Sequence, residues 1–259
     1  MNNAPPAPRP SPFSPFRRTS PWPARLDLLQ SGSGLFLGLF MWAHMGFVST
    51  ILISPDAFWT VARFFEGYFI FGRPYPGLVS LVVALVFAVL VLHAFLALRK
   101  FPGDWTQYTV FWRHAGRLGH GDTRLWLLQV ATGFAMFFLA PVHLYQMLVH
   151  PELIGPWESA DRVWSGGFWP LYLVLLLAVE LHGGVGLYRL AVKWIGFRDP
   201  ASARRRLLFL KWGMTAFFLV LGLFSLAAYV KLGMDHADQA GERYRPVGVW
   251  NAPVQETQT

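Results

Sequence analysis

Residues 169–193 read WPLYLVLLLAVELHGGVGLYRLAVK, a run in which apolar side chains predominate. It is longer than the ~20 residues that an α-helix needs to cross a lipid bilayer. Its basic residues, Arg189 and Lys193, stand at one end, as they do where a helix reaches the membrane surface. Its middle holds Glu180 and His182, which are costly in hydrocarbon unless they face a protein interior. We therefore expect a transmembrane helix whose polar side chains point into a bundle.

Four other apolar runs have a similar length, so we expect an all-α integral membrane protein with five transmembrane helices. The expected spans are 28–53, 77–98, 125–148, 169–193 and 207–230, and the first four form the bundle. In the whole chain 54% of residues are hydrophobic and 14% are charged, against ~25% charged residues in soluble domains. This composition excludes a soluble enzyme, a disordered protein and, despite the net charge of +8, a nucleic-acid-binding protein.

The basic residues predict the orientation. Most of the 22 Lys and Arg residues lie before the first span and in the segments 99–124 and 189–211. By the positive-inside rule these segments are cytoplasmic, so the N-terminus is expected in the cytoplasm and the C-terminus in the periplasm. The expected parts are a proline-rich cytoplasmic arm over 1–23, a five-helix domain over 24–233 and a polar periplasmic tail over 234–259. The arm is not a signal peptide, because no apolar stretch follows its start.

Four histidines inside the expected spans point to metal binding. The chain has eight histidines and no cysteine, which excludes cysteine-ligated clusters within it. At ~1.5 Å per residue, two of the histidines share an outer depth and the other two share an inner depth. The outer pair is His44 with His143, and the inner pair is His93 with His182. Two pairs at two depths fit two haem irons better than one zinc ion, which needs four ligands at one level. Four separately hydrogen-bonded structural histidines remain the alternative.

Basic and amide side chains recur on the faces that carry the histidines. Lys193 returns to the face of His182, and Arg189 and Lys100 each lie seven residues after an inner histidine. Gln30 lies on the side of His44, near the cytoplasmic boundary. Such groups could bind haem propionates, or they could simply anchor the helix ends at the membrane surface.

Two carboxylates stand in unusual places. Glu180 is the acid deepest in a span, and a carboxylate at that depth predicts a proton pathway or, alternatively, a structural hydrogen bond. Glu66 lies among aromatic residues in the outer segment 54–76, where a short interfacial helix or re-entrant turn is expected. It could accept protons from a quinol, or it could be a solvated loop residue.

The chain resembles the dihaem cytochrome b anchor of quinol:fumarate reductases, in the class with one large membrane subunit. The resemblance extends from about residue 24 to 233 and is weakest in 54–76 and 149–168, so the quinone pocket is its least certain part. The stretches that carry it are LDLLQSGSGLFLGLF (26–40) with His44, FAVLVLHAFLALRKF (87–101), HGDT (120–123), TGFAMFF (132–138) with His143, WPLYLVLL (169–176), and Glu180 to His182 with LYRLAVKW (187–194).

This resemblance implies roles for individual residues. His93 and His182 would ligate the haem near the iron–sulfur subunit, and His44 and His143 would ligate the distal haem. Glu66 would be the quinol-site carboxylate, and Glu180 would belong to a transmembrane proton route. The further haem contacts that it implies are Gln30, Ser31, Trp126 and Lys193, with Arg162 at the distal haem.

The function implied by the resemblance is that of the membrane anchor of a menaquinol:fumarate reductase in the bacterial cytoplasmic (inner) membrane. The chain would hold two haem b groups, oxidise menaquinol near the periplasmic side and pass electrons to an iron–sulfur subunit. A flavoprotein subunit with FAD would reduce fumarate, and the complex could form a dimer of heterotrimers. The alternatives are a succinate:menaquinone reductase running in reverse, the dihaem subunit of a formate dehydrogenase or hydrogenase, and a haem-free membrane transporter.

Overall fold

Five long helices dominate the structure, a computed structural model that describes residues 20–101, 104–118 and 121–246. They are α1 (Trp22–Val48), α4 (Pro76–Leu98), α6 (Gly121–Val149), α8 (Trp169–Trp194) and α9 (Pro200–Asp235). A short 3₁₀ turn, η1 (Ser49–Leu52), continues α1. All five are long and apolar enough to cross a membrane, and the described residues contain no strand. The all-α fold with five spans is therefore confirmed.

The observed helices are longer than the expected spans. Helix α1 begins at Trp22 rather than at residue 28, and α9 extends from Pro200 to Asp235 rather than from 207 to 230. Apolar runs mark only the hydrocarbon part of a helix, whereas backbone hydrogen bonds continue it into the interface. The N-terminal end of α9 is fixed by Asp199, whose carboxylate accepts hydrogen bonds from the first backbone amides.

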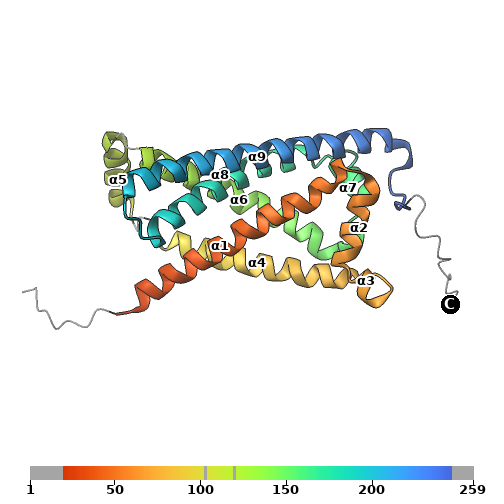
Figure 1. Ribbon diagram of the computed structural model, residues 1–259, viewed down its shortest axis with the longest axis horizontal. Helices are drawn as coiled ribbons and strands as arrows, with labels where there is room; N and C mark the ends of the chain where they lie inside the picture. The colour runs from red at the N-terminus through yellow and green to blue at the C-terminus, as the bar shows by residue number, and fades with distance from the viewer. Residues whose placement is uncertain (1–19, 102–103, 119–120, 247–259) are drawn as a thin grey trace, which may run out of the picture.

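Helices α1, α4, α6 and α8 form a ring in which each contacts the next and α8 returns to α1. Helix α9 lies outside this ring, along α8 (Figure 1). Large apolar side chains on α6, including Phe134, Phe137 and Phe138, are exposed on the chain, as expected for a surface that faces lipid.

Short helices cover the two ends of the bundle (Figure 1). At one end lies α5 (Trp105–Leu118). At the other lie α2 (Pro55–Phe65), α3 (Tyr68–Phe71), η2 (Pro151–Leu153) and α7 (Pro156–Val163). We call these the α5 end and the α2–α7 end. A further turn, η3 (Ala237–Gln239), follows α9.

The segment 54–76 contains two short helices, α2 and α3, where a short interfacial helix or a re-entrant turn is expected. Ser54 accepts a hydrogen bond from the backbone N–H of Ala57, 3.0 Å away, and so caps the start of α2. Gly67 and Gly72 flank α3 with φ angles of 75° and 71°. That left-handed conformation favours glycine, because a Cβ atom would be strained there. The chain can therefore reverse direction twice between α1 and α4 and bring α2 back against α7.

Candidate functional site

The inner histidines face each other between α4 and α8. The ring centres of His93 and His182 are 6.5 Å apart, and the rings are nearly perpendicular. Nδ1 of His182 donates a hydrogen bond to the backbone carbonyl oxygen of Gln129, 2.9 Å away. Ser33 donates its own hydrogen to the carbonyl of Gln30, so its oxygen accepts from Nδ1 of His93 at 3.1 Å. Both hydrogen bonds place the ring proton on Nδ1 and leave Nε2 free to bind a metal.

The outer histidines face each other between α1 and α6. The ring centres of His44 and His143 are 6.1 Å apart, with an angle of 53° between the rings. Phe40 stacks on His44, and Tyr172 of α8 packs edge-on against His143. Nδ1 of His143 is buried and has no hydrogen-bond partner among the described residues.

These distances fit one metal ion between the rings of each pair. Metal–imidazole bonds of about 2.0 Å place a ring centre roughly 3 Å from the metal, so two axial rings lie about 6 Å apart. Glycines make room beside the inner pair: a Cβ on Gly34 or on Gly133 would lie only 2.9 Å from a carbon of the facing imidazole. Within the described part of the chain, no cluster of three or more His, Cys, Asp or Glu side chains could form a closed zinc site. The arrangement therefore favours bis-histidine ligation of two separate irons.

Two of the three cations predicted near the inner pair, Lys100 and Lys193, lie around Asp27 at the α5 end, whereas Arg189 donates to the side-chain oxygen of Gln129, 2.8 Å away. The carboxylate of Asp27 lies 2.9 Å from Nζ of Lys100, 3.0 Å from Nζ of Lys193 and 3.0 Å from the guanidinium of Arg99. Sequence reasoning missed Asp27, because it stands one residue before the expected first span. The sequence feature that could have identified Asp27 is its place beside a cluster of basic residues that is predicted to be cytoplasmic. Its carboxylate partly neutralises the charge of that cluster.

The other predicted haem contacts are divided between the two ends. Ser31 accepts a hydrogen bond from the indole N–H of Trp194, and Gln30 has a buried side-chain oxygen without a partner among the described residues. Trp126 is half-buried on α6. Arg162 lies on α7, where it donates to the Leu153 carbonyl and to Ser159. Its buried Nε has no hydrogen-bond partner within the described residues, so this N–H is available to donate to an anionic group.

Glu180 is completely buried between α8 and its neighbours α1 and α9. The indole of Trp42, which stacks on Phe218 of α9, lies near the carboxylate, but its N–H makes no hydrogen bond within the described residues. Neither carboxylate oxygen has a hydrogen-bond partner among the described residues. The role of this acid, in a proton pathway or as a structural group, stays a prediction.

Glu66 is buried at the α2–α7 end, with 1% of its surface exposed. It follows the last residue of α2, and Nη1 of Arg63 lies 2.7 Å from one carboxylate oxygen. Arg63 also donates to the carbonyl of Ile154, which ties α2 to the segment before α7. Burial raises the pKa of Glu66 to about 7, although the Arg63 guanidinium opposes this effect. The alternative of a solvated loop residue is excluded by this burial.

Comparisons with known proteins identify the family of the chain. Residues 106–221 match the family described as succinate dehydrogenase/fumarate reductase transmembrane subunit. The fumarate reductase cytochrome b subunit of Wolinella succinogenes is 54% identical over 227 residues, which are 87% of this chain and 89% of that protein. The chain belongs to the family of fumarate reductase cytochrome b subunits. The subunit of the same name from Helicobacter pylori J99 is 53% identical over 83% of this chain and 84% of its own length.

Membership of this family establishes the setting of the site. A fumarate reductase cytochrome b subunit is the membrane anchor of an oxidoreductase complex, and the five apolar helices make this chain a multi-pass protein of the bacterial inner membrane. The predicted family, membrane location and anchor role are confirmed. The roles of the individual histidines and carboxylates stay predictions.

Proposed function

We propose that the chain is the quinol-oxidising anchor of a menaquinol:fumarate reductase and that it binds two haem b groups. His93 and His182 would hold one haem, and His44 and His143 would hold the other. The observation that carries this proposal is the pair of ring separations, 6.5 and 6.1 Å, each of which leaves room for one iron that both imidazoles of the pair would hold. When bound, the two haems supply one-electron transfer along the bundle.

The residues of the chain divide the remaining work between the two ends. Glu66 at the α2–α7 end accepts a proton as menaquinol is oxidised there, and the burial that raises its pKa suits it to that task. Glu180 carries a proton within the membrane. The inner haem would be held by Lys100, Lys193, Gln30, Ser31 and Trp126, and the outer one by Arg162. The N-terminus and the α5 end face the cytoplasm, and the α2–α7 end faces the periplasm.

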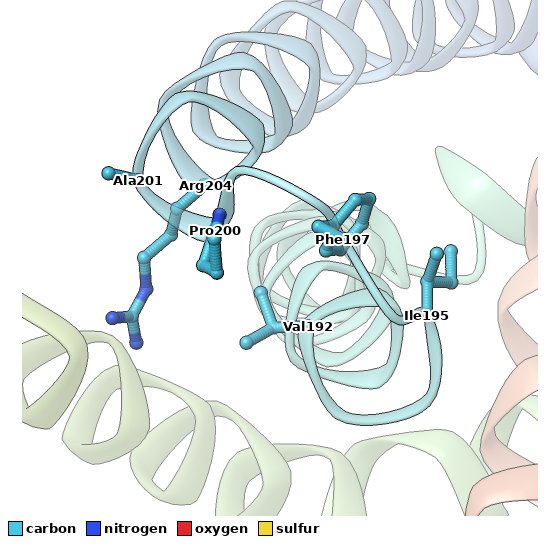
Figure 2. A pocket seen from close by; sticks show the side chains of 6 residues that line it. All are labelled: Val192, Ile195, Phe197, Pro200, Ala201 and Arg204. Carbon is cyan, nitrogen blue, oxygen red and sulfur yellow. The ribbon is translucent and has the colours of Figure 1, made fainter.

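The partner subunits would bind at the α5 end. An iron–sulfur subunit there receives the electrons, and a flavoprotein subunit with FAD reduces fumarate to succinate. A hollow of about 440 Å³ lies at the turn between α8 and α9 (Figure 2). Its walls are apolar except for Arg204, which pairs with Asp122 of α6. The lining offers apolar contact surface rather than reactive groups. We therefore expect this hollow to bind a side chain of a partner subunit rather than to catalyse a reaction.

The experiment that tests the proposal is a dithionite-reduced minus oxidised absorption spectrum of the purified complex, with haem quantified per chain. We expect about two low-spin b-type haems per chain. A folded complex without haem would contradict the proposal and would leave the histidines as structural groups. Turnover in both directions, with menaquinol plus fumarate and with succinate plus menaquinone, then tells whether the complex favours fumarate reduction.

Replacing Glu180 with Gln is expected to slow quinol-linked fumarate reduction by roughly 10²-fold, the usual contribution of a positioned proton carrier. Turnover with an artificial donor that reduces the partner subunits directly should be unchanged, because that route needs no proton from the membrane. The haem spectrum checks that the variant is intact, and Glu180→Asp, which keeps the carboxyl group, should retain more activity than Glu180→Gln. An equal loss in both assays would refute a proton pathway.

A further inference from the structure

The residues that follow α9 fold back onto the α2–α7 end. We call residues 236–246 the post-α9 segment. His236 is only 6% exposed, and its ring stacks on that of Trp157 with 4.3 Å between the ring centres. Its Nδ1 donates a hydrogen bond to one carboxylate oxygen of Asp161, 3.1 Å away. The other oxygen of Asp161 accepts a hydrogen bond from the backbone N–H of Gly241 at 2.8 Å. A single, partly exposed carboxylate of α7 therefore fixes the start and the middle of the segment.

Tyr244 joins the segment to both short helices. Its hydroxyl donates to Asp56 in the first turn of α2 at 2.7 Å, and its backbone N–H donates to Glu158 in the first turn of α7 at 3.4 Å. Its ring packs edge-on against Trp157. Burial, together with the hydrogen bond to Asp56, raises the pKa of Tyr244, so the phenol keeps the proton that it donates. The segment thus holds α2, and with it Glu66, against α7.

Arg243 brings a charge to this contact. Its guanidinium lies 3.9 Å from the carboxylate of Glu158 and also donates to the backbone carbonyl of Glu152. The side chain of Glu158 is only 9% exposed, and one of its oxygens has no hydrogen-bond partner among the described residues. The charged groups that act on Glu66 are Arg63 on α2, Glu158 on α7 and Arg243 in the post-α9 segment.

We propose that the post-α9 segment covers the Glu66 site, and that the Arg243–Glu158 pair held by it controls proton release from Glu66. This inference deepens the proposed function and rests on it. Arg243 and Glu158 are positioning residues, which act through Glu66 and not by contact with quinol or haem. Their charges act in opposite directions, because Arg243 favours the ionised carboxylate of Glu66 and Glu158 disfavours it.

The opposite effects of Arg243 and Glu158 on the pKa of Glu66 provide the test of this proposal. The assembled complex is prepared with Arg243→Gln and, separately, with Glu158→Gln, and quinol-linked fumarate reduction is measured from pH 5 to 9. Loss of Arg243 should raise the pKa of Glu66, so the acid limb of the pH profile, where activity falls at low pH, should move to higher pH by roughly 0.5 pH unit. Loss of Glu158 should lower the pKa of Glu66 and move the acid limb to lower pH by a similar amount. The double variant should return close to the original profile, because the two charges are removed together. Damage to the fold alone would lower activity in both variants without opposite shifts.

The matched controls are Arg245→Gln and Glu242→Gln, since both residues are exposed in the same segment and neither is among the charges that act on Glu66. Their acid limbs should not move. Shifts of the same sign, or no shift, in Arg243→Gln and Glu158→Gln would overturn the proposal.

A second measurement separates this proposal from the proposed function. The infrared band of the protonated carboxyl group that disappears in Glu66→Gln is titrated in each variant, without turnover. Opposite shifts of that titration support the control of Glu66 by the post-α9 segment even if Glu66→Gln still oxidises quinol, in which case the proposed quinol role is the part that fails. A titration that stays fixed in both variants would contradict the segment's role, whatever the activity of Glu66→Gln.

Discussion

Replacing His93 with Ala is expected to remove one haem and leave the other. The ring centre of His93 lies 6.5 Å from that of His182. If both imidazoles ligate one iron, the variant keeps only one of these two ligands, and we expect the haem to bind much more weakly. The absorbance of the reduced minus oxidised spectrum should fall by about half, the share of one of two equal sites. His44→Ala should remove the complementary half, because its ring faces His143 in the other pair.

The control for these variants is His150→Ala. His150 lies outside the spans at the α2–α7 end, and 58% of its side chain is exposed. It should retain both haems. Retention of both haems in His93→Ala would contradict the pairing, and loss of both would show that the two sites do not fold independently.

Replacing Glu66 with Gln is expected to reduce quinol-linked turnover by roughly 10²-fold or more, while both haems remain. The amide has nearly the shape of the carboxyl group but cannot take a proton from the quinol. Turnover with an artificial donor to the partner subunits should be unchanged. Glu152→Gln, at the same end but with 44% of the side chain exposed, is the matched control. Normal quinol oxidation by Glu66→Gln would refute the assigned role.

The pH dependence of the unmodified complex should report the same carboxyl group. Glu66 accepts a proton only when it is ionised, so a raised pKa moves the loss of activity to higher pH. With a pKa of about 7, quinol-linked turnover should fall nearly tenfold for each unit below pH 6, whereas a solvated glutamate would keep it constant down to about pH 5. Burial dominates here over the Arg63 ion pair, which by itself would have lowered the pKa.

The helices and the histidine pairs could be predicted because both follow from local rules. A span needs a fixed number of apolar residues, and helix rise converts sequence position into depth. His93 and His182 lie far apart in sequence, yet their depths alone predicted that they would meet, as they do. The quinol-site carboxylate was harder to place, since the aromatic residues around Glu66 fit a buried position and a solvated loop equally well.

The apolar pattern, the helical rise and the sequence motifs are therefore enough to predict the all-α membrane fold, the five spans, the depths of the four histidines and the family. Three features depend on the folded bundle: the burial of Glu66, the positions of Lys100 and Lys193 around Asp27, and the return of Tyr244 to α2. The physical reason is the range of the interactions. Hydrophobic length and helical rise act within one segment, whereas these contacts join groups on different helices, and their geometry depends on how the whole bundle packs.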